Sequence, residues 1–132
     1  MSTSYTVIVE RFAERHFIKS FSKKYKGAWD STWAGILQQF VNFDELFKSS
    51  IAETIARDSN IMICKAEFRV HGTQVSRHGS GNRCIVAIHK DTCRVCVLLV
   101  YGKTDLSGHN ETAEWKRLVR ENYEEYKNIV SL

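Results

Sequence analysis

The sequence predicts an α+β fold in which helices cover a small antiparallel sheet. Between Ile61 and Lys103, three apolar segments alternate with the period of two that is typical of strands. On both sides of this region, apolar residues instead recur every three or four positions, as they do along one side of a helix. Because the chain has 132 residues and no proline to mark a linker, we expect one domain over 1–132.

The three predicted strands cover 61–70, 83–89 and 94–103 and form a meander. Successive side chains of a strand point to opposite faces of the sheet. The even-numbered positions, such as Cys64 and Leu98, are apolar, and we expect them to be buried against the helices. The other face should be polar and suited to an anionic ligand. Toward the strand ends it carries Lys65, Arg69, Arg83, Tyr101 and Lys103.

The N-terminal part of the chain predicts a strand and a helical hairpin. Residues 5–10 alternate as a short strand, and the phenylalanines of 11–24 share one side of a helix. A second helix, capped by Asp30 or Ser31, continues to Val41 with tryptophan and aliphatic residues along one side. The apolar sides of these two helices are both expected to pack on the apolar face of the sheet.

Two further helical patterns follow. After a break at Asn42, an apolar stripe as far as Ile55 predicts either a new helix or a bent continuation of the preceding one. The last element is a helix over 113–129, with Asn110 or Thr112 as its cap. The complete expected order is therefore strand, helices, three-strand meander, helix.

The four cysteines are expected to be packing residues. Cys93 and Cys96 form a C-x-x-C, but an apolar strand begins between them and no second close pair could complete a zinc site. A buried free cysteine packs like a small hydrophobic residue. The sequence thus predicts no metal site, and we find no cofactor-binding motif.

Charge is concentrated in the predicted sheet. Residues 65–103 contain seven Lys/Arg and two Asp/Glu, whereas the whole chain has a net charge of +4. A basic patch of this kind is expected for a protein that binds nucleic acid. With no long apolar run and no secretory leader, we expect a soluble, cytoplasmic protein without a membrane segment.

A polar face with several cations could cleave RNA. Attack by a 2′-hydroxyl needs a group that takes its proton, cations that offset charge on the phosphate, and a proton donor for the leaving oxygen. Each cation alone could equally be a solvated residue at a strand end. The candidates are Arg69, Arg83, Lys65 and Lys103 for the phosphate, and Tyr101, His71 and His109 for the protons.

Three segments resemble the RelE/HigB-type toxins of bacterial type II toxin–antitoxin systems, in the RelE/ParE superfamily. They are KAEFRV, the glycine- and serine-rich loop ending in SGNR, and LLVYGKTD. The resemblance implies a RelE-like fold and a metal-independent, ribosome-dependent mRNA endoribonuclease that inhibits translation. It also implies a cognate antitoxin as partner, in a toxin–antitoxin hetero-oligomer, with mRNA and the ribosome as targets.

The resemblance assigns roles by position. Arg69 matches the basic residue of the first strand, Arg77 the loop lysine and Arg83 the arginine after a glycine pair, although SGN stands here for that pair. Tyr101 and Lys103 match a Y-x-K. The catalytic candidates are accordingly Arg69, Arg83, Tyr101 and Lys103. The RNA-binding candidates are Lys65, His71, Arg77, His78 and His109.

Two other functions stay open. A ParE-like toxin would inhibit a protein target such as DNA gyrase without catalysis, and a plain RNA-binding domain would bind without cleavage. The number of cations favours the nuclease over the ParE-like protein. Tyr101 is the one stacking aromatic residue expected on the polar face, which disfavours a simple binder of single strands.

Overall fold

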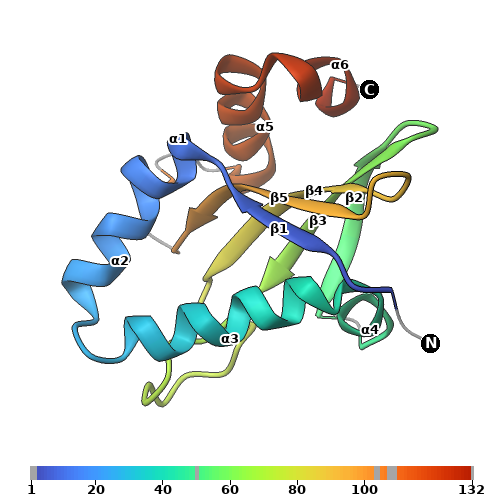
Figure 1. Cartoon of the computed structure of the whole chain (residues 1–132). Helices are drawn as coiled ribbons and strands as arrows, with labels where there is room; N and C mark the ends of the chain where they lie inside the picture. The colour runs from blue at the N-terminus through green and yellow to red at the C-terminus, as the bar shows by residue number, and fades with distance from the viewer. Residues whose placement is uncertain (1–2, 50, 103–104, 107–109, 132) are drawn as a thin grey trace.

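The computed structural model describes residues 3–49, 51–102, 105–106 and 110–131 (Figure 1). In chain order, its elements are β1 (Thr6–Val9), α1 (Arg11–Ala13), the π-helical turn η1 (Glu14–Ile18), α2 (Lys19–Lys24), α3 (Trp29–Val41), α4 (Phe43–Lys48), β2 (Ala52–Arg57), β3 (Ile61–Glu67), β4 (Arg83–His89), β5 (Arg94–Tyr101), α5 (Glu111–Asn122), the 3₁₀ turn η2 (Glu124–Tyr126) and α6 (Lys127–Val130).

The strands form one sheet in the order β1-β5-β4-β3-β2. β1 is parallel to β5, and the other neighbours are antiparallel. The α+β class, the N-terminal strand and the β3-β4-β5 meander are thus confirmed. Two strands are shorter than expected, because β3 ends at Glu67 and β5 at Tyr101.

The segment expected to be helical as far as Ile55 is mostly a strand. α4 ends at Lys48, and β2 then pairs with β3, with Glu53 opposite Lys65. A turn closes this hairpin, in which Asp58 Oδ1 accepts hydrogen bonds from two backbone N–H groups, each at 2.8 Å. The prediction was wrong because Ile51 and Ile55 have a spacing that suits a helix, whereas cross-strand pairing with β3 decides the structure.

Helices lie on both faces of the sheet (Figure 1), and an apolar layer separates each group of helices from the sheet. The first, between the sheet and α1–α4, contains Phe40 and Val86. The second, between the sheet and the C-terminal helices, contains Ile85 and Trp115. The expectation that helices cover one face was therefore wrong. Every residue of β4 is buried, as in strands packed on both sides.

A β-bulge changes which residues of β5 face which layer. Ile85 pairs with Leu99 but Val86 pairs with Val97, so Leu98 is an extra residue opposite β4. Consequently Leu98 and Leu99 both belong to the second layer, and Val97 belongs to the first. The prediction that even-numbered positions pack against the N-terminal helices holds for β3 and β4, but it is wrong for Cys96 and Leu98 of β5.

The predicted helices are confirmed with interruptions. The helical run from α1 to α2 contains the π-helical turn, and the C-terminal helix breaks at Tyr123, where φ is −134° and ψ is 90°. Asn110 caps α5, since its side chain accepts a hydrogen bond from Ala113 N at 3.1 Å. By contrast, neither Asp30 nor Ser31 caps α3, which begins at Trp29. In the part of the chain described, no helix has the length and apolarity to span a membrane.

Three cysteines pack in the core, as expected. Cys64 and Cys84 lie in the first layer and Cys96 in the second. Cys93 is half-buried in the turn before β5, with a positive φ of 52°. Within the described ranges, no three His, Cys, Asp or Glu side chains come together in a way that could hold a metal ion.

Candidate functional site

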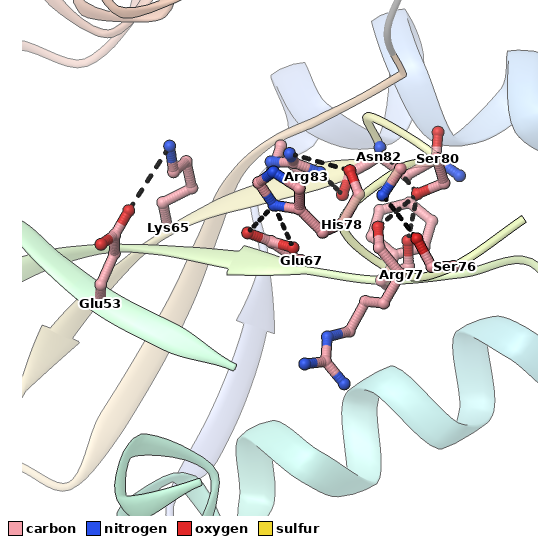
Figure 2. A network of polar contacts seen from close by, with 11 residues as sticks. Glu53, Lys65, Glu67, Ser76, Arg77, His78, Ser80, Asn82 and Arg83 are labelled. Carbon is pink, nitrogen blue, oxygen red and sulfur yellow. Dashed lines mark hydrogen bonds and ion pairs between the residues drawn. The ribbon is translucent and has the colours of Figure 1, made fainter. Parts of the chain in front are cut away.

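One end of the sheet is polar on the face covered by the C-terminal helices. Glu67 of β3 pairs with Arg83 of β4, which pairs in turn with Tyr101 of β5. Lys65 lies one step further along the same face of β3, since alternate residues share a face. The predicted grouping of Lys65, Arg83 and Tyr101 on one face is therefore present, and Figure 2 shows Lys65 and Arg83.

Arg83 is buried rather than exposed to a ligand. It is 7 % exposed, its Nη1 donates to the carbonyl of Asn82 at 3.0 Å, and its Nη2 donates to the carbonyl of His78 at 3.4 Å. Its Nε has no hydrogen-bond partner among the described residues. The guanidinium therefore joins β4 to the loop that precedes it.

Glu67 and Glu53, the carboxylates near this end, each contact a basic side chain. Glu67 lies 3.1 Å from His78 Nδ1, and Glu53 lies 3.5 Å from Lys65 Nζ (Figure 2). Partial burial acts to raise the pKa of Glu67, but the hydrogen bond from His78 and the charge of Arg83 outweigh it and lower that pKa. Both carboxylates are therefore engaged by side chains of the protein itself.

Tyr101 is buried beneath the C-terminal region. It is 1 % exposed, and its hydroxyl lacks a hydrogen-bond partner among the residues that the structure describes. Burial, followed by the negative charge of Glu111, raises the pKa of Tyr101 well above its usual range. An RNA strand on the present surface does not reach this hydroxyl, so a catalytic role for Tyr101 requires that it be uncovered.

The other predicted residues line a groove on the opposite side of the loop. Arg69, His71 and Arg77 contribute to a cavity of about 460 Å³ against α3, whose residues Thr32 and Gln39 form the facing wall. Arg77 points toward α3, and Lys65 points away from it (Figure 2). The structure thus divides the expected single cluster into two. Glu67 also lines the groove, but its carboxylate contacts His78, whereas Arg69 and Arg77 form no ion pair with any described residue.

His71 is held in the groove by the first turn of α3. Its backbone N–H donates to Thr32 Oγ1 at 2.9 Å, and its Nδ1 lies 2.9 Å from Ser31 Oγ. Sequence reasoning took Ser31 for a helix cap and did not connect it to His71, which is 40 residues away. The sequence signal for this contact was the pair of adjacent hydroxyl residues, Ser31 and Thr32, in the first turn of α3.

Serine hydroxyls fix the loop between the two clusters. Ser80 Oγ donates to the carbonyls of Phe68 at 2.9 Å and Arg77 at 2.7 Å, and Ser76 Oγ accepts from Gly79 N at 2.9 Å. A Cβ on Gly79 would come within 2.8 Å of Ser76 Oγ. The loop therefore has a defined conformation that presents Arg77 to the groove. Of the remaining predicted site residues, Lys103 and His109 lie outside the described residues.

Comparisons with known proteins give a similarity at the level of structure. No family model matches the chain, and no curated protein sequence matches it. The structure is similar to a chain in the crystal structure of an archaeal RelE–RelB complex from Pyrococcus horikoshii OT3. The TM-score is 0.43 and the identity 11 %, over 76 % of this chain and 96 % of that chain. These values do not place the protein in a family.

Proposed function

We propose that the protein is a RelE-like toxin that cleaves mRNA, with the groove between α3 and the loop as its RNA-binding site. The observation that supports this proposal is the grouping of Arg69, Arg77 and His71 along one groove, whose one acidic lining residue among those described, Glu67, contacts His78. Arginine contacts phosphate with two N–H groups at once, and imidazole exchanges protons near neutral pH. Cations beside a proton-transfer group meet the needs of phosphodiester cleavage.

The proposed reaction begins at the 2′-hydroxyl. His71 takes the 2′ proton through Nε2, because Nδ1 faces Ser31, and the 2′-oxygen then attacks the adjacent phosphorus. Arg69 and Arg77 stabilise the charge that develops on the phosphate oxygens. The 5′-oxygen leaves with a proton, and the products are a 2′,3′-cyclic phosphate and a 5′-hydroxyl. Arg83 acts as a positioning residue that holds the loop. Water supplies the proton of the leaving 5′-oxygen, because Tyr101 is buried in the other cluster.

The deciding experiment maps RNA ends after incubation with free mRNA and with mRNA-programmed ribosomes. We expect discrete cuts that bear 2′,3′-cyclic phosphate ends, with higher activity on ribosomes. His71→Ala should lower the cleavage rate by about 10²-fold, as is typical for loss of a general base. The matched control is Arg57→Ala, which removes an exposed cation outside the groove and should leave the rate unchanged.

Whether Ser31 positions His71 can be tested by the pH dependence of the cleavage rate. Ser31→Ala removes the group that faces His71 Nδ1, so the pH at which the cleavage rate is half-maximal should move, while the fold is retained. Ser31→Thr keeps the hydroxyl and should restore the original pH profile. An unchanged profile in Ser31→Ala would show that His71 is not the base, and absence of cleavage in all conditions would reject the nuclease.

An antitoxin is the proposed protein partner. A positively charged groove is expected to bind an acidic segment, and such a contact should weaken as salt increases. We therefore expect co-expression with the neighbouring antitoxin gene to give a hetero-oligomer in which Arg77→Ala weakens binding. An interaction that is insensitive both to salt and to Arg77→Ala would place the antitoxin elsewhere on the surface.

The burial of Arg83 and Tyr101 favours one alternative function. With these two side chains covered, fewer catalytic candidates reach a ligand than the sequence predicts. A non-enzymatic, ParE-like toxin that inhibits a protein such as DNA gyrase needs no exposed catalytic residues. Toxicity on induction with intact mRNA would support this alternative, and toxicity that disappears in His71→Ala would support the nuclease.

A further inference from the structure

A second cavity lies on the other side of the loop, between α2 and the end of β5. Its volume is about 170 Å³, and its walls include Phe21, Tyr25, Asn82 and Asp105. The loop that ends at Asn82 separates this cavity from the cationic groove, since Thr73 and Ser80 line the cavity whereas Ser76 and Arg77 line the groove. The proposed cleavage reaction gives this cavity no role.

Asn82 places an unused amide in the cavity. The residue is 7 % exposed, and its backbone N–H and carbonyl are both hydrogen-bonded. Its side-chain amide makes no hydrogen bond to any described residue and lines the cavity, so it can bind a ligand there.

Acceptor oxygens converge at the same wall. A Cβ on Gly102 would come within 3.1 Å of Asn82 Oδ1 and within 3.3 Å of Asp105 Oδ2. Glycine leaves room for both oxygens, because a Cβ here would make unusually tight contacts with them. The wall presents carboxamide and carboxylate acceptors, and the amide adds donors. This combination matches the edge of a nucleobase, which carries both donors and acceptors.

The opposite wall is a stack of aromatic rings. Phe21 and Tyr25 are nearly parallel, with an interplanar angle of 21° and ring centroids 6.1 Å apart, and Trp29 stacks on Phe21 at 4.8 Å. Lys24 also lines the cavity, and its Nζ lies 5.3 Å from the centre of the Tyr25 ring. Flat rings beside a cation are the usual surface for a stacked base and its phosphate.

We propose that this cavity binds one nucleobase of a single-stranded RNA, with Asn82 and Asp105 at the edge of the base, an aromatic ring beside it and Lys24 at its phosphate. The inference rests on the proposed function, because the RNA strand would pass from the groove across the loop. It adds a recognition site, which would select the nucleotide next to the cleavage position.

The test uses nucleoside 5′-monophosphates and the intact protein, followed by NMR. We expect at least one nucleotide to shift the Asn82 side-chain amide signals, and inorganic phosphate to leave them unchanged. Tyr25→Leu should weaken nucleotide binding about tenfold or more, as expected when a stacking ring is lost. Lys24→Ala should weaken it about fivefold, the effect of one exposed charge pair.

Lys23→Ala provides a matched control. Lys23 is the exposed neighbour of Lys24 on α2 and does not line the cavity, so its loss should not change nucleotide binding. Equal effects of Lys23→Ala and Lys24→Ala, or equal shifts with phosphate alone, would overturn the base site.

Failure of the base site and failure of the proposed nuclease are distinguishable. Arg77→Ala changes the groove and should abolish most cleavage without changing mononucleotide binding. If RNA is cleaved but no nucleotide shifts the Asn82 signals, the base site is wrong and the nuclease stands. If nucleotides bind in the cavity but no RNA is cleaved, the nuclease is wrong and the base site stands.

Discussion

Arg77 and Arg83 are close in sequence but have opposite environments. Arg77 is exposed and points into the groove, while Arg83 is buried and bonded to two backbone carbonyls. Alternation along the strands correctly predicted the face on which Arg83 lies. It could not predict burial, because this depends on the loop that precedes β4, whose carbonyls at His78 and Asn82 accept hydrogen bonds from the guanidinium.

Replacement of Arg83 by alanine should therefore affect stability as well as activity. Arg83→Ala removes two charge-assisted hydrogen bonds and leaves the carbonyls of Asn82 and His78 without their donor. We expect the free energy of unfolding to fall by about 1.5–3 kcal/mol in urea titrations. Arg77→Ala, at an exposed site, should change it by less than about 0.5 kcal/mol. A similar stability in both variants would mean that Arg83 does not hold the loop.

At the level of elements, one buried hydrogen bond connects the C-terminal helices to the sheet. His89 Nε2 at the end of β4 lies 2.7 Å from the hydroxyl of Tyr126 in η2. Burial, and then the charge of Arg94, lowers the pKa of His89, against the opposing charges of Glu125, Asp91 and Asp58. The folded state therefore favours the neutral imidazole, which can accept the hydrogen bond from Tyr126.

Stability should decrease in mild acid for this reason. The unfolded chain binds a proton at His89 more readily than the folded protein does, so stability is greatest above the ordinary histidine pKa of 6.5 and falls as pH decreases below it. Urea unfolding between about pH 8 and pH 5.5 should show this fall, and His89→Gln should reduce it. His16→Gln, at an exposed histidine, is the control that should behave like the unchanged protein.

Some of the helices and strands could be predicted from the sequence alone, and others could not. The meander and α3 have strong periodicity, and both were correctly predicted. β2 was missed because an edge strand of six residues has a weak pattern, and its partner β3 decides its structure. The bulge at Leu98 could not be predicted either, since alternation along β5 continues in the sequence across the point where pairing shifts by one residue.

In the whole molecule, the positive charge is divided by the loop. Composition correctly indicated that cations are concentrated near the sheet, but strand alternation placed Arg69 beside Arg83. The chain leaves the sheet after Glu67, so the rule of alternation no longer applies at Arg69. Arg69 instead lies with Arg77 on the side of α3.

Binding of RNA should depend strongly on salt through these two arginines. For single strands, the slope of log affinity against log salt is about −0.7 for each phosphate neutralised. In a His71→Ala background that prevents cleavage, Arg77→Ala should make the slope less negative by about 0.7, measured by fluorescence anisotropy from about 50 to 200 mM KCl. Lys48→Ala, an exposed cation already paired with Glu45, is the control. An unchanged slope in Arg77→Ala would remove the groove from the RNA-binding surface.

The parallel pairing of β1 with β5 has a consequence for the newly made chain. Thr6 pairs with Arg94 and Val9 with Val97, so β1 has no partner until most of the protein has been synthesised. Contacts between segments so distant in sequence require closure of a long loop and slow the folding of small domains. The hairpins of β2 to β5 can form earlier, because each strand follows its neighbour. On the ribosome, therefore, the first strand to emerge is the last to join the sheet, and its exposed edge is available to chaperones throughout synthesis.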